Sequence, residues 1–121
     1  MPDGSILSEL RPRPSAIVLG DGAFLQGYRD FGGNAAWEAH FLNDVLPCES
    51  GHWGQDWYAN GYRSRAQFHP GSWATASAIT GQIDGSDPYA VGANVAVWSN
   101  LIAHPGSTAG WPTCWWRGVV P

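Results

Sequence analysis

The chain has only two cysteines, Cys48 and Cys114, and they lie far apart in a sequence of 121 residues. A disulfide between them would force the tail back to the middle of the chain. In the chain-entropy model, closing so long a loop stabilises a fold by roughly 4 kcal/mol. Two cysteines usually pair in exported proteins and stay reduced in the cytosol. Residues 1–19 show no secretory signal, because a basic start and a long enough apolar stretch are both missing. The residues alone therefore leave the pairing open.

Composition limits the classes of function. The length fits a single domain with a modest core. Six basic and ten acidic residues give a formal charge of −4, so the chain lacks the basic stripe that nucleic-acid binding requires. No stretch approaches the length of a membrane-spanning helix. We expect a monomer that neither binds nucleic acid nor inserts into a membrane.

The eight tryptophans divide into two groups. Trp37 and Trp98 fall at apolar positions of predicted helices, and we expect them in the core. Trp53, Trp57 and Trp111 lie among glycines and polar residues, so they could serve either the core or a binding surface. Aromatic rings at such a surface can stack on the faces of sugar rings.

The first predicted helix leads directly to an acidic residue. It begins at Asn34, a favourable N-cap, and carries apolar residues at helical spacing up to Pro47. Proline lacks a backbone donor and disfavours helix at the preceding residue, so we expect the helix to end or kink there, with Glu49 at its exit. Residues 1–33 contain many prolines and glycines and are expected to form an irregular N-terminal arm. The domain itself is expected over residues 34–121.

The rest of the domain alternates between loops and two further helices. Residues 51–65 are predicted to form a loop with a short hairpin at Asn60-Gly61, a favoured two-residue turn. A second helix is predicted to begin at Pro70. A third has Asp87 as its cap and is expected to end at residues 104–106.

Five short motifs occur in order between residues 36 and 116: Cys48-Glu49-Ser50-Gly51 with Trp53, Asn60-Gly61-Tyr62, Gln67-Phe68, Ser72-Trp73 and Trp111-Pro112-x-Cys114. Together they resemble the resuscitation-promoting-factor and transglycosylase-like domains, which act on peptidoglycan. The resemblance implies an α+β, mainly α, small lysozyme-like fold with a short hairpin or irregular lobe and one disulfide, Cys48–Cys114. It also implies that Glu49 is the catalytic acid and that Gln67 and Trp73 help to form the cleft floor. No cofactor is implied.

Three features depart from the family's pattern. Ser64 and Arg65 stand where the family commonly has two glycines, and Ala66 where it has a larger aliphatic residue. Pro47 is atypical directly before the catalytic motif, and residues 1–33 have no recognised counterpart. An arginine at position 65 could narrow the cleft or bind a carboxylate of the peptide stem or lactyl group.

The expected chemistry is protonation of a glycosidic oxygen. Glu49 can supply the proton if burial against aromatic rings, for which Trp53 and Trp73 are candidates, raises its pKa. Asp56 is the nearest candidate for a second acid. Without one, the muramyl C6 hydroxyl can attack within the substrate and give a 1,6-anhydro product. The residues expected to line the saccharide groove are Trp53, Tyr62, Gln67 and Trp73, with Arg65 as an anionic contact.

Other classes of function stay open. The four histidines lack the paired spacing of zinc sites, so no metal site is expected. A cysteine peptidase with Cys48 as nucleophile and His69 or His104 as base would require free thiols. A non-catalytic glycan-binding or virion structural module could share the fold. The main hypothesis places the protein outside the cell, in the cell wall, or in a phage virion or lysis system.

Overall fold

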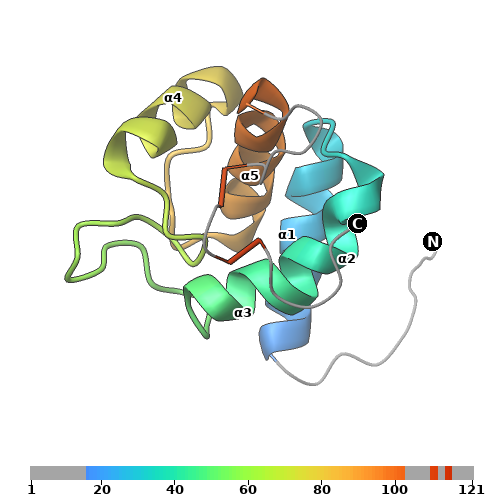
Figure 1. The fold of residues 1–121 in the computed structure, drawn as a ribbon, viewed down its shortest axis with the longest axis horizontal. Helices are drawn as coiled ribbons and strands as arrows, with labels where there is room; N and C mark the ends of the chain where they lie inside the picture. Colours follow the sequence, from blue (N-terminus) through green and yellow to red (C-terminus); the bar gives the residue numbers. More distant parts are fainter. Residues whose placement is uncertain (1–15, 103–109, 112–113, 116–121) are drawn as a thin grey trace.

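The longest helices pack around α5 (Pro88–Ile102). Helix α1 (Ala16–Asp30) and helix α4 (Pro70–Thr80) both contact α5 and lie on different sides of it (Figure 1). No helix in the described part of the chain is both long and apolar enough to cross a membrane. The computed structural model describes residues 16–102, 110–111 and 114–115.

Helix α1 shows that the expected irregular arm is wrong for residues 16–30. Phe24 and Tyr28, one turn apart on this helix, are fully buried. A Cβ atom on Gly27 would lie 2.1 Å from a carbonyl oxygen of α5, and one on Gly92 would lie 2.0 Å from the carbonyl oxygen of Phe24. Gly27, one of the glycines that suggested a broken chain, therefore allows two helix backbones to approach closely together with Gly92, and a side chain at either position would prevent this approach.

The segment that leads to Glu49 is a continuous helical run with changing geometry. Asn34 caps it as predicted, because its side-chain oxygen accepts a hydrogen bond from the backbone N–H of Ala36 at 2.9 Å. The run then passes through 3₁₀, α, π and α geometry. Its parts are η1 (Ala35–Trp37), α2 (Glu38–His40), η2 (Phe41–Val45) and α3 (Leu46–Glu49).

The π-helical turn explains how the run continues past Pro47. The backbone N–H of Leu46 bonds to the carbonyl oxygen of Phe41, five residues back, so the helix widens just before the proline. Pro47 then lies in the first turn of α3, where a missing backbone donor costs little. The proline distorts the helix, and Glu49 remains the last helical residue.

The lobe between α3 and α4 is irregular, with two isolated antiparallel bridges. Trp57 pairs with Arg63, and Arg63 pairs in turn with Phe68. The turn between the last two requires left-handed backbone at Ser64 (φ 66°) and Gln67 (φ 56°). Such a conformation favours glycine, which the resembled family commonly has at the position of Ser64.

The predicted hairpin exists but its turn is one residue longer than expected. The backbone N–H of Tyr58 donates to the carbonyl oxygen of Tyr62 at 3.0 Å, which leaves residues 59–61 in the turn. Gly61 occupies the left-handed region at φ 87°. A three-residue turn that ends in a left-handed glycine is a common alternative to the two-residue Asn-Gly turn.

The starts of the two later helices agree with prediction. Pro70 is the first residue of α4, and the ring of His69 caps this helix by accepting from the N–H of Gly71. Asp87 caps α5 by accepting from the N–H of Tyr89 at 3.0 Å. The predicted end of α5 at residues 104–106 lies outside the described residues. The mainly helical fold with one disulfide is confirmed.

Candidate functional site

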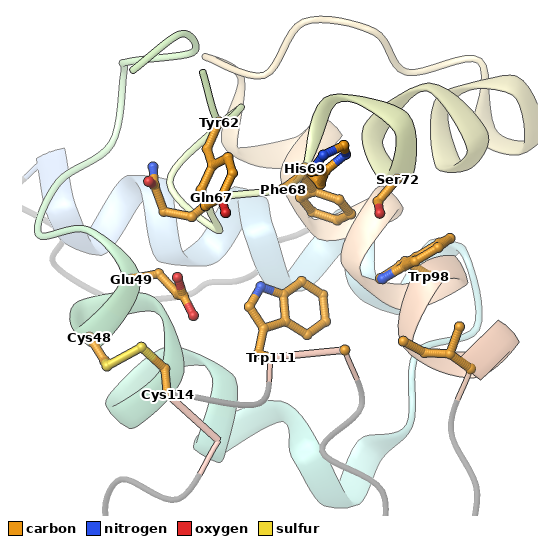
Figure 2. A pocket seen from close by; sticks show the side chains of 12 residues that line it. Cys48, Glu49, Tyr62, Gln67, Phe68, His69, Ser72, Trp98, Trp111 and Cys114 are labelled. Atoms are coloured by element: carbon orange, nitrogen blue, oxygen red, sulfur yellow. A yellow bond between two sulfur atoms is a disulfide. The ribbon is translucent and has the colours of Figure 1, made fainter. Parts of the chain in front are cut away.

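A cleft of about 650 Å³ opens between α3, the irregular lobe, α4 and α5 (Figure 2). This volume lies within the range of ligand-binding sites. The cleft is lined by the aromatic rings of Tyr62, Phe68, Trp98 and Trp111. Among the described residues that line it, Glu49 has the only carboxylate.

Glu49 lies half-buried at the end of α3, with its side chain directed into the cleft (Figure 2). No described residue forms a hydrogen bond or an ion pair with its carboxylate. Burial raises its pKa from the ordinary value of 4.5 to about 7, because the ionised form loses contact with water. The carboxyl group can therefore hold or release a proton near neutral pH, as a general acid/base must.

The disulfide that the resemblance implied is confirmed. Cys48 and Cys114 are joined, with their Cα atoms 5.6 Å apart. Because the sulfur of Cys48 is bonded, it cannot act as the nucleophile of a cysteine peptidase in this state. Of the two proposed bases, His69 lines the cleft and His104 lies outside the described residues.

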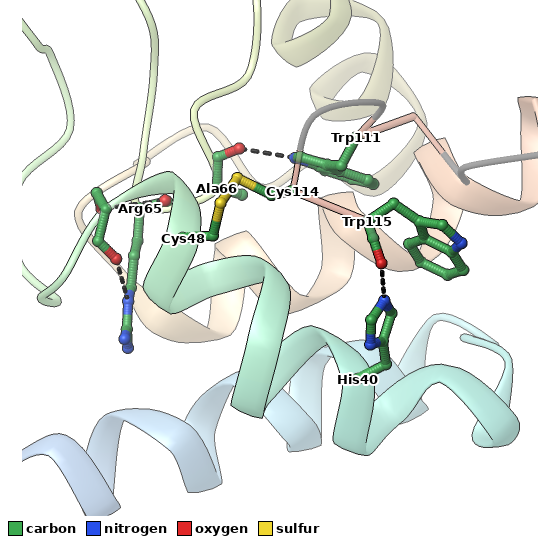
Figure 3. Close-up of a disulfide and its surroundings, with 8 residues drawn as sticks. His40, Cys48, Arg65, Ala66, Trp111, Cys114 and Trp115 are labelled. Carbon is green, nitrogen blue, oxygen red and sulfur yellow. Dashed lines mark hydrogen bonds between the residues drawn. A yellow bond between two sulfur atoms is a disulfide. The ribbon is translucent and has the colours of Figure 1, made fainter. Parts of the chain in front are cut away.

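Trp111, three residues before Cys114, also lines the cleft. Its indole N–H donates to the carbonyl oxygen of Ala66 at 2.7 Å, and its ring is buried (Figure 3). Next to the disulfide, Trp115 accepts a hydrogen bond at its carbonyl oxygen from Nε2 of His40. The segment that carries Cys114 is thus tied at three points, two on the helical run that ends at Glu49 and one on the lobe that follows it.

Arg65 does not contact the cleft, so its expected role as an anionic contact there is wrong. Its side chain is 7% exposed and its Nε–H donates to the carbonyl oxygen of Ser50 at 3.1 Å (Figure 3). The hydroxyl of Ser50 donates in return to the carbonyl oxygen of Arg65 at 3.1 Å. The guanidinium lies 4.7 Å from the ring centre of Trp53 and 3.7 Å from Asp21 on α1. Arg65 therefore braces the backbone directly after Glu49.

Trp53 is likewise absent from the described cleft lining. Its ring lies against Gly20 of α1, where a Cβ atom would come within 2.3 Å of it. Its indole N–H donates to Asp21 at 2.9 Å. Trp53 therefore fixes the lobe to α1, and it cannot form the apolar wall next to Glu49 that the sequence suggested.

Asp56 is fully engaged outside the cleft, so it is not the expected second acid. Its two oxygens accept from Arg63 at 2.8 and 2.7 Å. One of them also accepts from the backbone N–H of Gly85 at 3.1 Å. The guanidinium of Arg63 stacks 4.1 Å from the ring centre of Trp57. Asp56 thus joins the lobe to the loop before α5.

Of the three remaining predicted groove residues, two line the cleft and one lies behind its lining. Tyr62, which is 40% exposed, and Gln67 both line the cleft. The amide of Gln67 is oriented by a bond from Asn60 at 3.1 Å. Trp73 is 2% exposed and packs behind Phe68, with ring centres 5.1 Å apart. Trp73 therefore supports the floor from behind.

Several lining residues were not predicted. Trp111 had been left open between the core and a binding surface, and its position three residues before the cysteine that bonds next to Glu49 could have decided this. His69 and Ser72 line the cleft because they belong to the cap and the first turn of α4. Trp98 was expected in the core, but it is half-buried and lines the cleft. Helix α5 is apolar on most of its circumference, so its sequence does not show which side faces the cleft.

No protein-family model matches this chain, and no curated protein or solved structure matches it either. Within the described ranges, no three histidine, cysteine, aspartate or glutamate side chains are grouped so that they could hold a metal ion. The cleft and Glu49, the one acid among its described lining residues, are the features that bear on function.

Proposed function

We propose that this protein is a lysozyme-like peptidoglycan glycosidase that cleaves the β-1,4 bond between N-acetylmuramic acid and N-acetylglucosamine, with Glu49 as general acid/base. One observation carries the proposal: a half-buried carboxyl group with a pKa of about 7, without a partner among the described residues, lies in an aromatic-lined cleft. Glycoside cleavage requires such a proton donor next to the leaving oxygen.

The first step transfers the proton of Glu49 to the glycosidic oxygen while the bond from that oxygen to C1 of the muramyl sugar breaks. The leaving sugar departs with a hydroxyl group, and positive charge develops on the muramyl ring. The Glu49 carboxylate then takes a proton from the group that attacks C1. The carboxyl group is thereby restored for the next cycle.

The attacking group decides the product. Retaining and inverting hydrolases commonly use a second carboxylate, either as a nucleophile or to activate water. Asp56 is held by Arg63 outside the cleft, and the described lining supplies no other acid. This favours attack by the C6 hydroxyl of the same muramyl sugar, which forms a 1,6-anhydro ring. The protein then acts as a lytic transglycosylase.

The aromatic lining supports the choice of a sugar substrate. Phe68 and Trp111 pack edge to face at 5.4 Å between ring centres and make a rigid apolar floor. Tyr62 offers an exposed ring at the rim, and Gln67 an oriented amide. Pyranose rings combine apolar faces with polar edges, which matches such a lining. Peptidoglycan lies outside the cytoplasmic membrane, where a disulfide is stable.

The test is mass spectrometry of the muropeptides that wild type, Glu49→Gln and Asp56→Asn release from purified cell walls. We expect anhydro ends from wild type and a loss of about 10³-fold in rate for Glu49→Gln, since general acid catalysis contributes that much. Asp56→Asn is the matched control, because it makes the same chemical change on an acid outside the cleft. It should retain the wild-type product pattern.

Each other outcome has a distinct meaning. Reducing ends would show hydrolysis by water in place of transglycosylation. Release by Glu49→Gln at the wild-type rate would remove Glu49 from the mechanism. No release by any variant, together with retained binding to cell walls, would support the alternative of a non-catalytic glycan-binding or virion module.

A further inference from the structure

One part of the cleft has features that bond cleavage at Glu49 does not use. There, α5 contributes Trp98 and Ile102, and the first turn of α4 contributes Ser72. In the view of Figure 2, the ring of Trp111 lies between this region and Glu49. A polymeric substrate bound at Glu49 would extend into such a region.

Trp98 carries a hydrogen-bond donor without an acceptor among the described residues. Its indole is half-buried and lines the cleft, with the nitrogen directed toward the middle of the cleft in Figure 2. Half-buried indole N–H groups usually have a partner. Three other indoles do donate to a carboxylate or a carbonyl oxygen, those of Trp53, Trp73 and Trp111. The N–H of Trp98 is therefore suited to an acceptor on a ligand.

His69 supplies a second donor at the rim. Its Nδ1 accepts from the backbone N–H of Gly71 at 3.2 Å, so in the neutral ring the proton is on Nε2. The ring is exposed and lines the cleft. Ile102 adds an aliphatic surface next to Trp98, because a Cβ atom on Gly110 would lie 2.8 Å from Cδ1 of Ile102 and 3.0 Å from Nε1 of Trp98. The region thus combines two N–H donors with an apolar wall.

We propose that Trp98, Ile102 and His69 form a saccharide subsite that recognises the acetamido group of an N-acetylhexosamine. This inference rests on the proposed function of the cleft. An acetamido group has a carbonyl oxygen that can accept from Trp98 Nε1–H and a methyl group that can contact Ile102. A plain hexose carries a hydroxyl at that carbon, which cannot make the methyl contact. His69 Nε2–H donates to an oxygen of the same sugar.

The experiment measures binding alone, in a Glu49→Gln background, by calorimetry. The probes are the β-1,4 tetramer of N-acetylglucosamine and the β-1,4 tetramer of glucose. We expect the N-acetylated tetramer to bind at least about tenfold more tightly, because a subsite built to hydrogen-bond a group discriminates against a ligand that lacks it. Trp98→Phe should weaken binding of the N-acetylated tetramer about fivefold through loss of one hydrogen bond. The difference in affinity between the two tetramers should therefore become smaller.

Two further variants on α5 test the role of the Trp98 ring: Trp98→Ala removes the ring, and Leu101→Ala serves as a control. Trp98→Ala should weaken binding of the N-acetylated tetramer by about 30-fold or more, as expected for a central aromatic contact. Leu101→Ala is the matched control, because Leu101 is 56% exposed on α5 and is not part of the cleft lining. It should bind as the parent does. If Trp98→Ala does not fold, Trp98→Phe decides the question.

Equal affinity for the two tetramers, or unchanged selectivity in Trp98→Phe, would overturn the subsite. A failure of the proposed catalysis would show separately, as cell-wall cleavage that continues in Glu49→Gln. Binding of the N-acetylated tetramer with the expected Trp98 dependence would still stand in that case. The two ideas therefore fail in different assays.

Discussion

Glu49 and Asp56 are two acids on neighbouring stretches of chain with opposite surroundings. Glu49 ends α3 and faces the cleft, and no described residue neutralises its charge. Asp56 has both oxygens bound by Arg63 and accepts a further bond from Gly85. The first is therefore free to exchange a proton with a ligand, whereas the second links two segments of the fold.

Glu49 depends on its neighbours for its position. The helix that carries Glu49 is tied to the tail by the disulfide, and the residue after it is held by Arg65. A carboxylate that made such ties itself would be held in its ionised form. The fold thus assigns structural bonds to Cys48, Ser50 and Asp56, and leaves Glu49 without any among the described residues.

Removing the disulfide should produce the largest loss of stability. Cys48→Ser with Cys114→Ser should lower the free energy of unfolding by about 4 kcal/mol, because the unfolded chain regains the freedom of a long loop. Urea denaturation measures this loss, and wild type with a reducing agent is the control that should lose a similar amount. A loss below about 1 kcal/mol would show that Glu49 is positioned without the covalent tie.

Changing each acid to its amide should affect the free energy of unfolding at pH 8 differently for Asp56 and for Glu49. Asp56→Asn should lower the free energy of unfolding by about 2 kcal/mol, because a charge-assisted bidentate pair with Arg63 is lost. Glu49→Gln should cause no loss, since it removes a charge that has no partner among the described residues. Urea denaturation of both variants measures the difference. Equal effects would mean that Asp56 is as dispensable to the fold as Glu49, and the contrast between the two acids would fail.

Local signals in the sequence predicted part of this arrangement. The caps Asn34 and Asp87 and the proline at position 70 correctly placed three helix starts, because capping depends on one or two residues. The disulfide was correctly implied by the family resemblance, whereas the residues alone had left the pairing open. The role of Glu49 stays a prediction, although its half-buried position in a cleft is what that role requires.

The errors over residues 16–30, Trp53 and Arg65 share one physical origin, the close packing of α1. Its glycines suggested an irregular arm, but Gly27 lies against the backbone of α5 and Gly20 lies against the ring of Trp53. Without α1 there was no partner for Trp53 and Arg65, so both were expected in the cleft. Asp21 on α1 binds both. Contacts between segments distant in sequence decide such placements, and no local pattern reports them.

The dependence of stability on pH is the smallest and most specific expected difference between the two acids. The pKa of Glu49 is raised to about 7 in the folded protein from an ordinary 4.5. Between these values the folded chain holds a proton that the unfolded chain releases. The contribution of Glu49 to stability is therefore fully present below pH 4.5 and is lost as the pH rises through 7.

We expect Glu49→Gln to gain on the order of 1 kcal/mol relative to wild type between pH 5 and pH 8, because solvent reaches part of the side chain and moderates the effect. Unfolding free energies of both proteins at several pH values measure this, with Asp56→Asn as the control that keeps the wild-type slope from Glu49. The rate of cell-wall cleavage should fall above pH 7 for the same reason, since only the protonated acid can donate to the leaving oxygen. A rate that stays constant from pH 6 to pH 9, with parallel stability curves for wild type and Glu49→Gln, would mean that the cleft does not hold a proton on Glu49. The contrast with Asp56 would then be one of position alone.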